Sequence, residues 1–101
     1  MSYERLAVHR LSDAPNTYVA ILQYPGLDVG PPVLVAPLLQ SDDLIHIPFV
    51  TVEVEFLGGI YLLATHQITA IPSVYIGEPL GDLMAYEYDI ARALSRIFFG
   101  N

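Results

Sequence analysis

Apolar and polar residues alternate most regularly in residues 49–56, FVTVEVEF, where every second side chain is Val or Phe. A period of two is that of a strand with one face buried and the other in water. Gly58-Gly59 follows closely and predicts a tight hairpin loop, after which residues 60–64, IYLLA, return as the partner strand. Residues 49–64 therefore predict an antiparallel hairpin.

Short runs of β-branched and aromatic residues also occur elsewhere, separated by glycine and proline. Such runs are typical of strands bounded by turns. They predict further strands at residues 5–10, 17–24, 33–39, 68–71 and 73–76. Pro37 lies inside the third of these runs. Because proline cannot donate a backbone hydrogen bond, it predicts an edge position or a bulge there.

The pattern changes at Asp82. Residues 82–99 contain no glycine or proline, and their apolar residues recur every three or four positions, as on one face of a helix. The residues of this stripe are Leu83, Tyr86, Ile90, Ala93, Leu94 and Ile97. Asp82 is a suitable N-cap, and Gly100 suits the position after the last helical residue. Short strands and one closing helix predict an α+β, β-rich fold: a small barrel of antiparallel strands with a long C-terminal helix.

Composition narrows the classes of function. The 101 residues suit one domain, residues 1–101, and the absence of cysteine excludes disulfides and thiolate chemistry. Apolar residues make up 53% of the chain, which is more than a single core of this size can bury. We therefore expect an apolar interface and a homodimer. Four arginines, no lysine and a net charge of −7 cannot form a broad basic face, so we expect no direct nucleic-acid partner. No apolar run has the length of a signal peptide or membrane span, which predicts a cytoplasmic protein without a membrane partner.

Residue chemistry alone predicts no catalytic residue, no cofactor and no metal site. His9, His46 and His66 lack the spacing of metal-ligand pairs. Glu53 and Glu55 share one face of an alternating strand, where such carboxylates usually face water. No nucleotide-binding loop or nucleophile motif is present. On these grounds we do not expect an enzyme.

The chain ends in an apolar segment, Ile97-Phe98-Phe99-Gly100-Asn101. Adjacent residues of a helix lie about 100° apart, so a helix that buries the stripe ending at Ile97 cannot also bury both phenylalanines. An exposed aromatic side chain is a typical interface anchor. This anchor serves either a dimer contact, for which Ile97 and Phe98 are the candidates, or a different protein, and the residues alone leave both open.

Several motifs of the C-terminal part occur together. The stretch THQITAIPSVYIGE at residues 65–78 is followed by Asp82-Leu83, by Asp89-Ile90 and by the ending Phe98-Phe99-Gly100. Over residues 62–101 the chain resembles the CcdB family of toxins, which also have a similar total length. The resemblance implies an SH3-like barrel with a long C-terminal helix, shared in outline with MazF-type ribonuclease toxins, and a homodimer.

The resemblance also implies a function and its partners. Proteins of the CcdB family are the toxins of toxin–antitoxin modules. They bind the A subunit of DNA gyrase, trap the enzyme on cleaved DNA, and are displaced by the disordered tail of an antitoxin. The family's contact with its target is a C-terminal Trp-Gly-Ile, which corresponds here to Phe99, Gly100 and Asn101. The resemblance therefore predicts a non-enzymatic inhibitor of gyrase, or of topoisomerase IV, that is neutralised by an antitoxin.

Two alternatives stay open. Phe99 and Asn101 replace the family's Trp and Ile, so the chain could be an inactivated homologue that only dimerises and binds an antitoxin. The other alternative is a MazF-type endoribonuclease on the same fold. Such an enzyme must hold an RNA phosphate with basic residues, and the chain offers Arg5, Arg10, Arg92 and Arg96.

Overall fold

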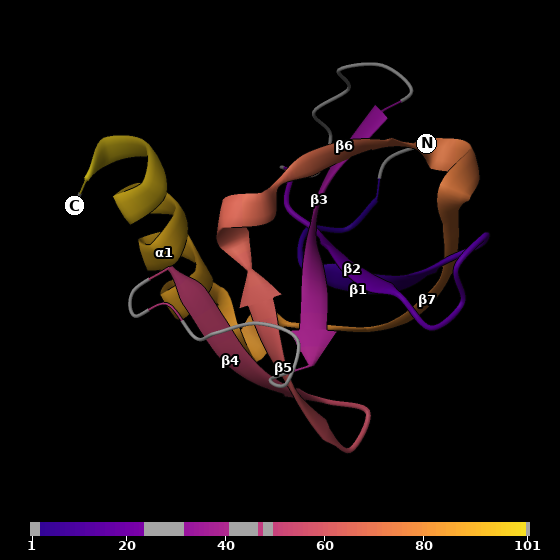
Figure 1. Cartoon of the computed structure of the whole chain (residues 1–101), viewed down its shortest axis with the longest axis horizontal. Helices are drawn as coiled ribbons and strands as arrows, with labels where there is room; N and C mark the ends of the chain where they lie inside the picture. The colour runs from indigo at the N-terminus through magenta and orange to yellow at the C-terminus, as the bar shows by residue number, and fades with distance from the viewer. Residues whose placement is uncertain (1–2, 24–31, 41–46, 48–49, 101) are drawn as a thin grey trace.

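The computed structural model describes residues 3–23, 32–40, 47 and 50–100, which form a seven-stranded antiparallel sheet followed by a helix (Figure 1). The strands are β1 (Ala7–Leu11), β2 (Tyr18–Ile21), β3 (Pro32–Gln40), β4 (Thr51–Phe56), β5 (Gly59–Ala64), β6 (Thr69–Pro72) and β7 (Ile76–Asp82). Short 3₁₀ turns span Thr65–Gln67, Ser73–Tyr75 and Met84–Tyr86, and the helix α1 spans Glu87–Phe99. The strand order is β4-β5-β3-β2-β1-β7, with β6 also paired to β3.

The sheet curls into an open barrel because β3 changes partner along its length. Its first half, Pro32 to Val35, pairs with β6, and its last residues, Leu38 to Gln40, pair with β5. The chain then passes from β6 to β7, which closes against β1, so that these strands form a ring around an apolar interior (Figure 1). The prediction of an α+β, β-rich barrel with a C-terminal helix is confirmed.

Pro37 shows how this change of partner accommodates a proline. Of the two predicted alternatives, the edge position is wrong, because β3 has neighbours on both sides, whereas the ladder is interrupted at Pro37. On one side Pro37 pairs with Val19 of β2, and on the other it lies between the end of the β6 register and the start of the β5 register. The residue without an N–H therefore occupies the gap in the ladder.

The hairpin of β4 and β5 was predicted, but its loop is displaced by one residue. Phe56 pairs with Gly59, which leaves Leu57 and Gly58 as the two loop residues, with φ of 49° and 77°. Positive φ at both positions is the signature of a type I′ turn. Gly59 is the first residue of β5, so the loop is not Gly58-Gly59.

The strand predicted at residues 73–76 is wrong. Ser73–Tyr75 is a 3₁₀ turn, and the strand β7 begins at Ile76. Gly77 allows β7 to approach β1, since a Cβ atom at this position would lie 2.5 Å from the carbonyl oxygen of Arg10. The residues after Pro72 therefore form a 3₁₀ turn first, and the chain pairs with β1 only from Ile76 onward.

The remaining strands follow their predicted positions closely. The run at residues 5–10 becomes β1 only from Ala7, because Leu6 takes a left-handed backbone conformation with φ of 65°. Leu6 is buried, its N–H donates to Ile21, and its carbonyl oxygen accepts from the N–H of Leu83 at 2.8 Å. This residue ties β2 to the segment that precedes α1. Tyr24, predicted to end the second strand, lies outside the described residues.

The helix packs its apolar face on one of two core clusters. This cluster joins the sheet to α1 through Val54, Leu63, Leu83, Ile90 and Ala93. The second cluster fills the interior between β1, β2 and β3, with Val19, Ile21, Val33 and Val35. The stripe predicted for the helix is therefore correct at its buried positions.

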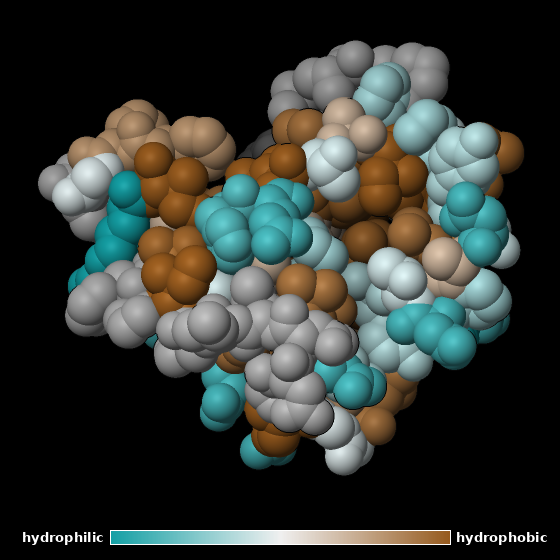
Figure 2. All heavy atoms as spheres, viewed as in Figure 1, coloured by the Kyte–Doolittle hydropathy of each residue, from teal (hydrophilic) through white to brown (hydrophobic). Residues whose placement is uncertain are grey.

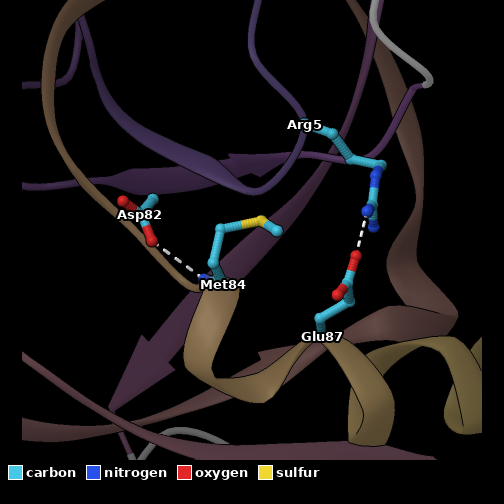
Figure 3. Close-up of polar contacts among 4 residues, drawn as sticks. All are labelled: Arg5, Asp82, Met84 and Glu87. Carbon is cyan, nitrogen blue, oxygen red and sulfur yellow. Dashed lines mark hydrogen bonds and ion pairs between the residues drawn. The ribbon is translucent and has the colours of Figure 1, made fainter.

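The start of the helix differs from the prediction, whereas its end agrees. The side chain of Asp82 accepts a hydrogen bond from the Met84 N–H at 2.9 Å, so Asp82 caps the 3₁₀ turn and α1 begins later, at Glu87. Glu87 forms an ion pair with Arg5, which holds the first helical turn to the segment before β1 (Figure 3). Gly100 has φ of 76° and ends the helix as predicted.

Among the described residues, no helix is long and apolar enough to cross a membrane.

Candidate functional site

The C-terminal end of α1 carries two exposed aromatic rings. Phe98 is 63% exposed and Phe99 is 76% exposed, whereas Ile97 is half-buried. The end of the helix forms an apolar projection at one margin of the molecule (Figure 2). Gly100 follows in its left-handed conformation, and Asn101 lies outside the described residues. The structure thus leaves both predicted anchor rings accessible to a partner.

A pocket of about 370 Å³ lies between the edge strand β4 and α1. We name it the β4–α1 groove. It is lined by Thr51, Val52, Glu53, Asp89, Arg92, Ala93 and Arg96. Two of the chain's four arginines and two of its acidic residues therefore line one pocket.

The helical side of the groove follows from spacing. Asp89, Arg92, Ala93 and Arg96 are three, four and seven positions apart, so they lie on one side of α1. Ala93 is buried against the sheet, whereas Asp89 and Arg92 are exposed and Arg96 is partly so. The groove therefore has a packed floor and a charged rim.

The strand side of the groove follows from the register of the hairpin. Phe56 and Gly59 close a two-residue loop, so alternate residues of β4 direct their backbone groups away from β5. The N–H of Thr51 donates to the carbonyl oxygen of Ile47 at 3.0 Å, and the N–H of Glu55 donates to the Tyr86 hydroxyl at 2.9 Å. Glu53 lies between these two residues, and by the same alternation its backbone groups face the groove.

The arginines of the chain differ in their partners. Arg5 forms an ion pair with Glu87, and Arg10 forms one with Glu78 at 3.5 Å. The guanidinium of Arg92 instead lies over the ring of Tyr88, 5.6 Å from its centroid. Its Nη1 also donates to the Tyr88 hydroxyl at 3.4 Å. Tyr88 therefore holds Arg92 at the rim of the groove.

The groove combines two kinds of chemistry. Guanidinium groups bind phosphate oxygens strongly, because their fork of N–H donors matches the anion. A carboxylate can accept a proton from a hydroxyl group. Glu53 is exposed, as the alternation of its strand predicted. Sequence reasoning missed the groove because it could not show that α1 lies beside β4, and it treated the arginines one by one. The spacing of Arg92 and Arg96 could have indicated the helical half only.

The contacts of the described histidines are those of ordinary packed or surface residues. His9 is buried, its Nδ1 lies 3.0 Å from the carbonyl oxygen of Gly77, and its ring meets that of Tyr3 edge-on. His66 is exposed beside Gln67, and His46 lies outside the described residues. Within the described part of the chain, no three His, Asp or Glu residues lie close enough to hold a metal ion.

Comparisons with known proteins support the fold. No family model and no curated protein matches the sequence. Among solved structures, an endoribonuclease from a mycobacterial species superposes with a TM-score of 0.72 and 18% sequence identity. The superposition covers 92% of this chain and 88% of that chain. This likeness shows that the two proteins share a fold.

The same comparison corrects one prediction. The expectation that the chain is not an enzyme is contradicted, because an endoribonuclease has this fold. The expectation rested on the absence of a recognisable motif. The residues of the β4–α1 groove are distant in sequence, so no motif could represent them.

Proposed function

We propose that this protein is the toxin of a toxin–antitoxin module and that it acts as an endoribonuclease of the MazF type. The observation that carries the proposal is the β4–α1 groove, which places two arginines and two carboxylates together on the fold of an endoribonuclease. The net charge of −7 excludes a broad basic face but not a groove that holds one phosphate between two guanidinium groups.

The groove supports cleavage by attack of the ribose 2′-hydroxyl. The Glu53 carboxylate takes the proton of this hydroxyl, and the 2′-oxygen forms a bond to the adjacent phosphorus. Arg92 and Arg96 bind the non-bridging oxygens, whose negative charge grows in the transition state. The bond from phosphorus to the 5′-oxygen breaks, and the leaving oxygen takes a proton from water. The products are a 2′,3′-cyclic phosphate and a 5′-hydroxyl end.

Cleavage of a labelled single-stranded RNA by the purified protein tests this proposal. We expect Arg92→Gln and Arg96→Gln each to lower kcat/KM by about 100-fold, the loss typical of one transition-state donor. Arg10→Gln is the matched control, because it removes the same charge at a residue paired with Glu78 outside the groove. An RNA of the same sequence with 2′-deoxy sugars should remain intact. Equal cleavage by all three variants would contradict the assignment of the groove.

A second candidate function is favoured by the exposed helix end. The C-terminal resemblance to the CcdB family assigns Phe99, Gly100 and Asn101 to a contact with the A subunit of DNA gyrase or with topoisomerase IV. The 76% exposure of Phe99 supports this proposal, because a ring so exposed is accessible for stacking on a guanidinium of a partner.

Two variants test the second candidate. Phe99→Ala should abolish toxicity in a bacterium without the antitoxin, with a Tm within about 2 °C of wild type because the ring is outside the core. Phe99→Trp combined with Asn101→Ile should strengthen topoisomerase inhibition about tenfold, by enlarging the stacking face and restoring an apolar end. A Tm that falls by many degrees in Phe99→Ala would instead place the ring in a dimer contact.

The two candidates are separated by running both reactions on one preparation. Degraded RNA with intact DNA supports the endoribonuclease, and linear DNA trapped in a gyrase reaction supports the topoisomerase inhibitor. If the protein neither degrades RNA nor traps cleaved DNA but still binds an antitoxin, it is an inactivated homologue. The three results exclude one another on the same protein.

We further propose a homodimer whose contact includes Ile97 and Phe98. Phe98 is 63% exposed, and Ile97 lies half-buried beside it, so the pair offers an apolar edge to a second copy. Light scattering at micromolar concentration should give twice the 11.1 kDa of one chain. A mass of one chain would contradict the dimer.

A further inference from the structure

Tyr88 presents an accessible phenol in the first turn of α1. Its side chain is 70% exposed. Of the other tyrosines in the described part of the chain, Tyr75 is 43% exposed and the rest are partly buried. The chain neighbours of Tyr88 are the acidic residues Glu87 and Asp89. Adjacent residues of a helix do not face each other, so the hydroxyl group of Tyr88 stays open to an enzyme in solution.

The Tyr88 hydroxyl oxygen lies beside a guanidinium group. The Nη1 of Arg92 donates to this oxygen at 3.4 Å, and the guanidinium carbon stands 5.6 Å from the ring centroid. The two residues are four positions apart, which makes them neighbours on the surface of the helix. The ion pairs found among the described residues involve Arg5 and Arg10 but not Arg92. An anionic group on the Tyr88 oxygen therefore meets a cation that no carboxylate of the described chain has already paired.

A phosphate group has the charge and the shape for this contact. Phosphotyrosine carries about −1.5 to −2 charges at neutral pH and offers three acceptor oxygens. Guanidinium groups bind phosphate through two parallel hydrogen bonds, which are stronger than bonds between neutral groups. A phosphate attached to Tyr88 therefore replaces the long hydrogen bond to Arg92 with a charged one.

The same phosphate changes the charge of the β4–α1 groove. Arg92 and Arg96 line the groove together with the two acidic residues Glu53 and Asp89, so its formal charges cancel. A phosphate at the rim makes the groove negative and occupies the donors of Arg92. A second phosphate, carried by a substrate, is then repelled and loses one of its two guanidinium partners.

We infer that Tyr88 is a phosphorylation site, and that its phosphate binds Arg92 and closes the β4–α1 groove to anionic substrates. A separate tyrosine kinase supplies the phosphoryl group from ATP. The Tyr88 oxygen forms a bond to the γ-phosphorus, the bond from this phosphorus to the leaving oxygen of ADP breaks, and the phenol proton passes to solvent. For its effect on activity the inference rests on the proposed endoribonuclease function, and it adds a means of regulating that site.

Two proteins with one phosphotyrosine each, introduced during translation, test the effect on the groove. One carries it in place of Tyr88. The matched control carries it in place of Tyr75, which is also exposed but does not line the groove. We expect the first protein to lose at least about tenfold in kcat/KM for RNA, because a transition-state donor is withdrawn. The control should stay within about twofold of the unmodified protein, and a phosphatase should restore the activity of the first.

Thermal unfolding gives a readout that does not depend on RNA. An anion four positions before an arginine on a helix forms a favourable pair, so phosphate on Tyr88 should raise Tm by about 2–4 °C. The rise should disappear in Arg92→Gln and shrink in about 1 M NaCl, where charges are screened within about 3 Å. Phosphotyrosine in place of Tyr75 should not produce it. Absence of the rise would overturn the contact with Arg92.

Incubation with a purified tyrosine kinase and ATP tests the site itself. Mass spectrometry of the digested protein should place the phosphate on Tyr88, and Tyr88→Phe should remove most of the incorporation. A phosphate placed on Tyr75 in preference to Tyr88, or no incorporation, would contradict the assignment. If phosphorylated and unmodified proteins cleave RNA equally, the closure is wrong and the proposed function stands. If the unmodified protein does not cleave RNA, the proposed function is wrong, whereas a rise in Tm that requires Arg92 still supports the phosphate contact.

Discussion

Replacing Gly77 by alanine tests the close approach of the backbones of β7 and β1. Gly77 lies in β7, and a Cβ atom added to it would stand 2.5 Å from the carbonyl oxygen of Arg10 in β1. Ordinary contact begins at 3.4 Å, and the neighbour is backbone, so no side chain can swing away. The two strands must separate by roughly 1 Å to admit the methyl group.

The expected magnitude follows from the contacts that hold these strands together here. The Ser12 N–H donates to the carbonyl oxygen of Tyr75 at 2.9 Å, and the ring of His9 lies 3.0 Å from the carbonyl oxygen of Gly77. Each hydrogen bond contributes about 1 kcal/mol, and alanine recovers about 0.5 kcal/mol by restricting the unfolded chain. Overpacking in a well-packed structure adds about 1 kcal/mol. Gly77→Ala should therefore lower the free energy of unfolding by about 2–3 kcal/mol.

Urea unfolding followed by far-UV circular dichroism measures this change. Gly58→Ala is the control, because Gly58 has φ of 77° but no atom within 4 Å of the added Cβ. It isolates the backbone strain of a left-handed alanine, about 1 kcal/mol. A Gly77→Ala protein as stable as wild type would refute the reasoning, since it would show that β7 can move away from β1 without loss.

Two further predictions concern the hairpin and the helix. Leu57→Asn should raise the free energy of unfolding by about 0.5–1 kcal/mol, because Asn adopts the left-handed φ of 49° in a type I′ turn at a lower cost than leucine. Urea unfolding measures this change, and Leu57→Ala should bring no gain. Ile90→Ala should lower the free energy of unfolding by about 2–4 kcal/mol, because Ile90 is 2% exposed and its loss leaves a cavity between α1 and the sheet. Thermal unfolding checks the second, and a shift in Tm of less than about 3 °C would contradict the burial of this helix face.

The sequence by itself determined the elements whose periodicity is local. The alternation in β4 specified which residues of that strand face the core, and the helical spacing through Ile90 and Ala93 specified the buried face of α1. The same spacing predicted that at least one of Phe98 and Phe99 faces solvent, as both do, and Gly100 predicted the end of the helix. Each of these patterns lies within one element, so neighbouring residues are enough to express it.

Only the tertiary structure decided where the elements meet. Glu53 faces water, as its strand predicted, and it lines a groove only because α1, some forty residues later in the chain, packs beside the edge strand. Pro37 predicted an edge position or a bulge, and it is tolerated in an interior strand because β3 changes partner beside it. Periodicity tells which face of an element is covered, but not which element covers it. That choice depends on long-range strand register and packing, so the β4–α1 groove exists only in the folded chain.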